Sequence, residues 1–143
     1  MRILASIAVV LTAWLLLINP IEASAHGNDP RGGRADEQMK KLHAMMLVFS
    51  VASAELGAAL EKGDVVAAKA QADKILAAVP DLKKSKPHKN SKQRKKFVEL
   101  ATSFEKTVNF TVDLAKKDDF SGAKAALKKV EEACAACHAK FRD

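Results

Sequence analysis

Apolar residues recur at steps of three and four along four successive segments of this 143-residue chain. Such spacing places them on one face of an α-helix, whereas a half-buried strand would need strict alternation. The segments run from Asp36 to Lys62, from Val65 to Val79, from about Ser91 to Ala115, and from Asp119 to Phe141. Abundant alanine and few clusters of β-branched residues also favour helices over a sheet. The sequence therefore predicts an all-α fold.

The first connection and the third, within the two halves of the chain, are short and have the composition of helix ends. Gly63 suits the end of the first helix, and Asp64 suits the N-cap of the second. Pro80 is expected to end the second helix, because the residue before a proline avoids the helical region. Residues 64–75 also align with residues 119–130 at an offset of 55. Two similar hairpins with tight connections predict an antiparallel up-down-up-down four-helix bundle over residues 36–143.

Residues 1–25 have the organisation of a signal peptide. Arg2 precedes a mostly apolar run over residues 3–18, and Asn19-Pro20 and the small residues Ala23-Ser24-Ala25 follow it. The run is shorter than the ~20 residues that span a bilayer. We therefore expect cleavage after Ala25, a periplasmic location and no integral membrane segment in the mature protein. The Gly-rich, polar residues 26–35 are expected to form a flexible leader.

Both cysteines of the chain lie in one motif, Cys134-Ala135-Ala136-Cys137-His138. A C-x-x-C-H run is typical of c-type haem attachment. On one helical turn the two thiols and the imidazole lie on neighbouring faces, so the thiols can bond the haem vinyl groups while the imidazole binds iron.

Three other interpretations of the motif fit less well. A dithiol redox site would need a βαβ unit, and a disulfide here would close too short a loop to stabilise the fold much. A zinc site would need two more ligands, and only scattered histidines remain. The sequence therefore predicts one covalently bound haem c.

Residues 134–142, CAACHAKFR, resemble the C-terminal haem signature of the cytochrome c-prime family, in which CxxCH is followed by an aromatic residue and Arg. The resemblance implies an antiparallel bundle with haem between the helices near one end. It implies Cys134 and Cys137 as the thioether residues, His138 as the proximal iron ligand and Arg142 as a haem contact. Family members usually have a longer connection between the first two helices than Lys62-Gly63-Asp64. Some leave the sixth iron position to an apolar side chain, and six-coordinate low-spin members fill it with a first-helix ligand.

The first helix offers three candidates for that sixth ligand. Met39, His43 and Met46 follow steps of four and three, so they form one stripe of the helix. Haem iron accepts either an imidazole or a thioether. Methionine also commonly fills gaps in a core, and a histidine at the edge of an apolar face is often a surface residue. We expect a first-helix ligand, with His43 ranked ahead of Met46 and Met39.

Residues 83–96, KKSKPHKNSKQRKK, hold eight Lys and Arg and no acid, whereas the whole chain has a net charge of +7. This basic segment is either a solvated loop or a surface that steers an acidic redox partner or an anionic membrane surface. Nucleic acid is not expected, because the protein is exported and no aromatic residues interleave with the charges. His88 within the segment either touches a haem edge or is solvated.

One haem and no second catalytic constellation predict a soluble periplasmic monohaem c-type cytochrome that carries electrons and is not an enzyme. The main alternative is a five-coordinate haem protein of the cytochrome c-prime type that binds NO or CO. A haem-bearing subunit of a larger redox complex is a third reading. The sequence leaves the oligomeric state open, a homodimer included.

Overall fold

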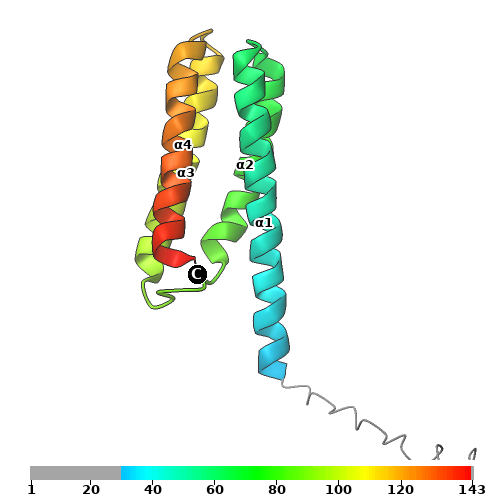
Figure 1. Cartoon of the computed structure of the whole chain (residues 1–143), viewed down its shortest axis with the longest axis vertical. Coiled ribbons are helices and arrows are strands. Elements are labelled where there is room, and N and C mark those ends of the chain that lie inside the picture. Colours follow the sequence, from blue (N-terminus) through cyan, green and yellow to red (C-terminus); the bar gives the residue numbers. More distant parts are fainter. Residues whose placement is uncertain (1–29, 143) are drawn as a thin grey trace, which may run out of the picture.

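The computed structural model describes residues 30–142, which form four helices and no strand over that range (Figure 1). They are α1 (Pro30–Glu61), α2 (Val65–Lys84), α3 (Arg94–Ala115) and α4 (Phe120–Phe141). Consecutive helices run antiparallel, α1 packs against α2 and α4, and α3 packs against the same two helices. The predicted all-α, up-down-up-down four-helix bundle is confirmed. The predicted signal peptide and residues 26–29 of the predicted leader lie outside the described residues.

The core is one continuous cluster that draws on all four helices. Its most enclosed large side chains have almost no exposed surface: Leu56, Leu60, Ile75, Val79, Val108 and Val130. Alanines at the helix contacts, among them Ala68, Ala72 and Ala123, are also fully buried. Two pairs of aromatic rings, Phe49–Phe104 and Phe97–Phe141, meet edge to face with centroids 5.4 and 5.2 Å apart. Small residues therefore hold the helices close over much of the bundle, and the phenylalanines pack toward the end where α4 terminates.

The two tight connections share one backbone geometry at the offset of 55 residues. Asp64 and Asp119 each donate their backbone N–H to the carbonyl five residues earlier, at 3.0 and 3.1 Å. The residue before each, Gly63 or Asp118, has a positive φ of 67° or 61°. Each aspartate side chain then accepts a hydrogen bond from the N–H three residues later, at 2.9 and 2.8 Å. The predicted end at Gly63 and N-cap at Asp64 are confirmed, and the internal repeat extends to the turns themselves.

The start of α1 differs from the sequence prediction. The helix begins at Pro30, so residues 30–35, which the prediction assigned to the flexible leader, are helical. Proline is favoured in the first turn because its missing N–H would have no partner there and its φ already suits a helix. α1 consequently extends beyond the rest of the bundle at its N-terminal end (Figure 1).

The end of α2 also corrects the prediction, because the helix continues through Pro80 to Lys84. A proline inside a helix costs about 3 kcal/mol through a lost hydrogen bond and a steric clash. Leu82, only 5% exposed, packs into the core beyond the proline. The carbonyls of Lys83 and Ser85 accept hydrogen bonds from the Arg94 guanidinium. These tertiary contacts stabilise a last turn that local sequence preference disfavours.

The stretch of α1 over Asp36–Glu61 is long and apolar enough to cross a membrane by length and composition alone. In the bundle, one face of it carries the buried side chains Leu42, Phe49 and Leu56. Its opposite face leaves Leu47, Val48 and Val51 exposed. Only 28% of the apolar window is buried, so the core of the bundle takes up a part of this apolar character.

Candidate haem site

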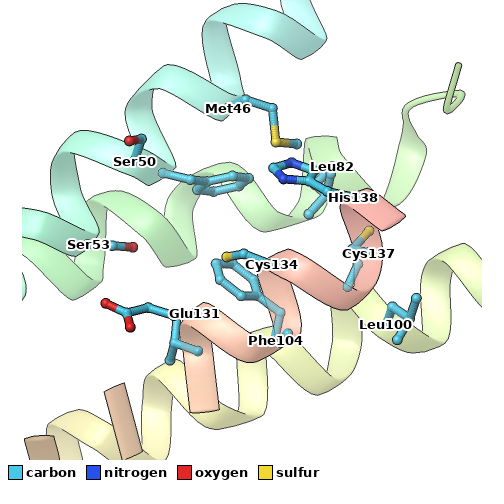
Figure 2. Close-up of a pocket in the computed structure, with 14 residues that line it drawn as sticks. Met46, Ser50, Ser53, Leu82, Leu100, Phe104, Glu131, Cys134, Cys137 and His138 are labelled. Atoms are coloured by element: carbon cyan, nitrogen blue, oxygen red, sulfur yellow. The ribbon is translucent and has the colours of Figure 1, made fainter. Parts of the chain in front are cut away.

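One cavity of about 330 Å³ lies between the helices, toward the end where α4 terminates, and brings the C-x-x-C-H residues together. Cys134, Cys137 and His138 line it from α4, as Figure 2 shows. The facing walls are mainly apolar and come from the other three helices: Met46, Phe49, Ser50 and Ser53 of α1, Leu82 of α2, and Leu100, Ala101 and Phe104 of α3. The motif residues are thus on the inner side of α4, as the predicted attachment of haem requires.

The burial of the two cysteines determines their protonation. Both are free thiols, and burial raises the pKa of each. The Glu131 carboxylate raises the pKa of Cys134 further, and the neighbouring Cys134 does the same for Cys137. The cysteines are therefore neutral thiols at neutral pH, unlike the reactive thiolates of dithiol redox sites.

His138 is shifted in the direction that suits a metal ligand. Burial lowers its pKa, and the positive charge of Arg142 lowers it further. A neutral imidazole has a lone pair available for a metal, whereas a protonated one does not. The backbone N–H of Arg142 donates to the His138 carbonyl at 3.0 Å, which closes the last turn of α4 beneath the ligand.

The donor set and the walls of the cavity fit haem c. Within the described residues no group of three or more His, Cys, Asp and Glu could hold a metal ion by itself. Two thiols three residues apart and one imidazole suit a macrocycle held by two thioether bonds and one axial ligand. Apolar walls that include Phe49 and Phe104 suit the faces of a flat aromatic ring system.

A second cavity, of about 430 Å³, adjoins the first and shares Met46, Ser50, Cys137 and His138 with it. Its other lining residues include His43, His88 and Arg142. His43 and His88 meet there, with their Nε2 atoms 3.0 Å apart.

The three predicted candidates for the sixth ligand occupy different places. Met46 lines both cavities and points into the cavity that His138 enters from the neighbouring helix α4 (Figure 2). His43 lines only the second cavity, and Met39 packs against the core and lines neither. Of the three candidates, Met46 alone shares the first cavity with His138, and ligation by His43, Met46 or Met39 stays a prediction.

Comparison with known proteins points to the same segment of the chain. The family model described as Cytochrome C' matches residues 83–142, which hold the basic segment, α3, α4 and the whole C-x-x-C-H motif. Over this segment the chain is similar to the cytochrome c′ family. No curated protein and no solved structure is similar enough to the chain to be matched.

The similarity over this segment indicates a c-type cytochrome with covalently bound haem c. Members of this family are typically exported. Both points agree with the residues that meet in the cavity. The matched segment includes the predicted thioether residues Cys134 and Cys137, the predicted proximal ligand His138 and Arg142.

The basic segment lies beside the candidate haem site, where His88 lines the second cavity together with His138. The loop between α2 and α3 lies at the same end of the bundle as the C-terminus (Figure 1). The Lys89 N–H donates to the carbonyl of Phe141 at 3.2 Å, and the Asn90 side chain donates to that of Lys140 at 2.7 Å. Asn90 has a φ of 53°, a left-handed conformation that asparagine tolerates better than most residues. Asn90 is therefore a local sequence signal for a turn within this loop.

Part of the charge of the basic segment is neutralised locally. Lys83 pairs with Glu105 at 2.6 Å in a half-buried contact, and weaker pairs join Lys84 to Asp81 and Lys96 to Glu99. Among the described residues Lys86, Lys92 and Lys95 form no ion pair. These three lysines are therefore the part of the segment best suited to an electrostatic contact with another molecule.

Proposed function

We propose that this protein is a soluble periplasmic electron carrier with one haem c. The observation that carries the proposal is the convergence of Met46 from α1 and His138 from α4 in one apolar cavity beside the two cysteines. Haem iron accepts both a thioether and an imidazole, so Met46 and His138 from the neighbouring helices α1 and α4 would both be able to bind it. Iron with two protein ligands favours electron transfer without binding a substrate.

The residues of the cavity would act by holding the group and its surroundings in place. Cys134 and Cys137 would anchor it covalently, and His138 would supply the proximal imidazole. The haem supplies a one-electron iron couple when bound. Phe49 and Phe104 keep the cavity wall apolar. Met46 as a ligand would give a higher reduction potential than a second imidazole.

We further propose that an acidic redox partner docks on the basic segment. Three lysines of the segment are exposed and form no ion pair within the described part of the chain: Lys86, Lys92 and Lys95. The loop that contains the first two is hydrogen-bonded to the end of α4. A positive field there would guide an acidic protein to the end of the bundle where His138 lies. The proposal assigns no catalytic role to the protein and no nucleic acid partner.

Gas binding at a five-coordinate haem is the second candidate function. The hydroxyl groups of Ser50 and Ser53 line the same cavity and are possible hydrogen-bond donors to a bound diatomic molecule. In this reading Met46 is an apolar wall residue and not an iron ligand, as methionine is in many cores.

The spin state of the purified haem protein separates the two candidates. We expect a six-coordinate low-spin spectrum in both oxidation states, no rapid binding of CO by the reduced protein, and fast electron exchange with small redox proteins. A high-spin spectrum with rapid CO binding would instead establish the gas-binding function.

A further inference from the structure

The outward face of α1 carries a group of neighbouring apolar side chains that the rest of the described chain leaves exposed. Leu47 is 66% exposed, Val48 44% and Val51 49%. Val51 lies four residues after Leu47 and three after Val48, so the three side chains are neighbours on the helix surface. Ala44, which is also exposed, extends the group by one turn. These four residues are called the α1 patch below. Single exposed apolar residues are common, whereas a contiguous group is typical of an interaction site.

The α1 patch borders the second cavity, which adjoins the candidate haem site. Leu47 belongs to the patch and also lines this cavity. Other lining side chains, Ser50 and Arg142 among them, are exposed, so the cavity opens to the surface. His138 lines the same cavity. A protein that rests on the patch would therefore lie close to the predicted haem, which is the position that an electron-transfer partner needs.

The basic segment reaches the same cavity. Pro87 and His88 line it from the loop between α2 and α3. Lys86, directly before them, is exposed and forms no ion pair with another described residue. On α1, the carboxylate of Glu55 lies one turn beyond the patch and pairs with Lys74 at 3.8 Å. The surface around the cavity thus combines an apolar patch with positive charge.

We propose that the α1 patch is the apolar contact surface for the acidic redox partner that the basic segment attracts. The inference rests on the proposed electron carrier and adds the surface that holds the partner after encounter. Attraction between charges mainly raises the rate of encounter, whereas burial of apolar side chains stabilises the complex. The partner that fits is a small redox protein with an apolar surface near its own cofactor and acidic residues beside that surface.

The size of the α1 patch favours a transient partner over a second copy of this chain. A patch of this kind covers on the order of a few hundred Å². Stable interfaces bury about 800 Å² on each partner, whereas transient redox complexes bury less than about 1,200 Å² in total. A small contact also dissociates quickly, and a carrier must leave its partner after each electron.

The test is stopped-flow electron exchange between the haem-loaded protein and an acidic blue-copper protein. The rate is measured at about 0.1 M and about 1 M salt, where the Debye length is about 10 and 3 Å. The test variant is Val48→Gln plus Val51→Gln, because neither valine lines the two cavities and glutamine is the better helix former. We expect its second-order rate constant to fall at least about fivefold at both salt concentrations, since salt does not screen the burial of apolar surface. Lys86→Gln should lower the rate constant only at the lower concentration.

Val66→Gln is the matched control for the loss of an exposed valine. Val66 is 81% exposed in the first turn of α2, which begins at the end of the bundle away from the C-terminus (Figure 1). This substitution should leave the rate constant unchanged at both salt concentrations.

Three results would overturn the inference. A wild-type rate constant for the double valine variant at the higher salt concentration would show that the partner does not contact the patch. An equal loss in Val66→Gln would show that the effect is not specific to this face. Sedimentation equilibrium that finds a dimer in the wild type and a monomer in the double variant would assign the patch to a second copy of the chain.

Failure of the electron-carrier proposal has a different result. The wild type would then be high-spin and would exchange electrons slowly with acidic and basic partners alike, which would overturn this inference as well. The first two results above, in contrast, are measured against a wild type that exchanges electrons rapidly.

Discussion

Removal of the two thiols tests the haem site most directly, because it should affect both cofactor and fold. We expect the double variant Cys134→Ala plus Cys137→Ala to lose all covalently bound haem. The cavity of about 330 Å³ would then lack the group that fills it, and its apolar walls would contact water or empty space.

The volume of the cavity sets the size of the stability loss. An empty cavity in a core costs about 24 cal/mol per Å³, so an upper bound for this one is about 8 kcal/mol. The cavity adjoins a second one and is not fully enclosed, so water entry and wall relaxation should roughly halve that value, to about 4 kcal/mol. Unfolding entropy is about 2.1 cal/mol/K per residue, which for roughly 110 folded residues converts this loss into a fall in Tm of about 17 °C.

The assay is thermal unfolding followed by far-ultraviolet circular dichroism, with haem staining of a denaturing gel on the same samples. Ala136→Ser is the matched control, because this exposed residue lies within the motif but does not line the cavity. Its haem stain should be retained and its Tm should change by less than about 2 °C, as expected for an exposed surface substitution. Haem retained through denaturation in the double variant would refute covalent attachment at these thiols. A double variant that loses haem yet melts within a few degrees of the wild type would refute the assignment of this cavity to the haem.

The remaining predictions concern the sixth ligand, the basic segment, the helix caps and the mature N-terminus. Met46→Leu should convert a low-spin haem spectrum to high spin while His43→Ala leaves it unchanged; the reverse result would restore His43 as the ligand. Replacement of Lys86, Lys92 and Lys95 by Gln should slow electron exchange with an acidic redox protein and flatten its salt dependence in stopped-flow measurements, because screening acts over a Debye length of about 8–10 Å. Equal, salt-independent rates of the wild type with acidic and basic partners would contradict this docking surface. Asp119→Ala should lower the free energy of unfolding by about 1 kcal/mol in urea titrations, since it removes the cap bond to Gly122; Asp118→Gly, which relieves a positive φ, should not destabilise the protein. The intact mass of the exported protein should equal residues 26–143 plus one haem; a membrane-bound form that retains residues 1–25 would contradict cleavage after Ala25.

Local chemistry made much of the fold predictable. Helical periodicity needs only neighbouring residues, and Gly63 and Asp64 specify a helix end and a cap through backbone conformation and one hydrogen bond. The C-x-x-C-H motif was equally readable, because both thiols and the imidazole act within one turn of α4. The family match over residues 83–142 supports the same assignment.

What depended on contacts between distant segments could not be read from the chain. On an isolated helix Met39, His43 and Met46 would form the same stripe. The packing of α1 in the bundle places Met46 in the cavity with His138. The same packing places His43 beside His88. α2 passes Pro80 because Leu82 reaches the core and Arg94 satisfies carbonyls at the end of the helix. The sequence by itself determined the helices, their caps and the haem-binding turn, all of which follow from interactions within a few residues. The tertiary structure alone decided which side chains share the cavity, because that choice depends on the burial of one helix face against another.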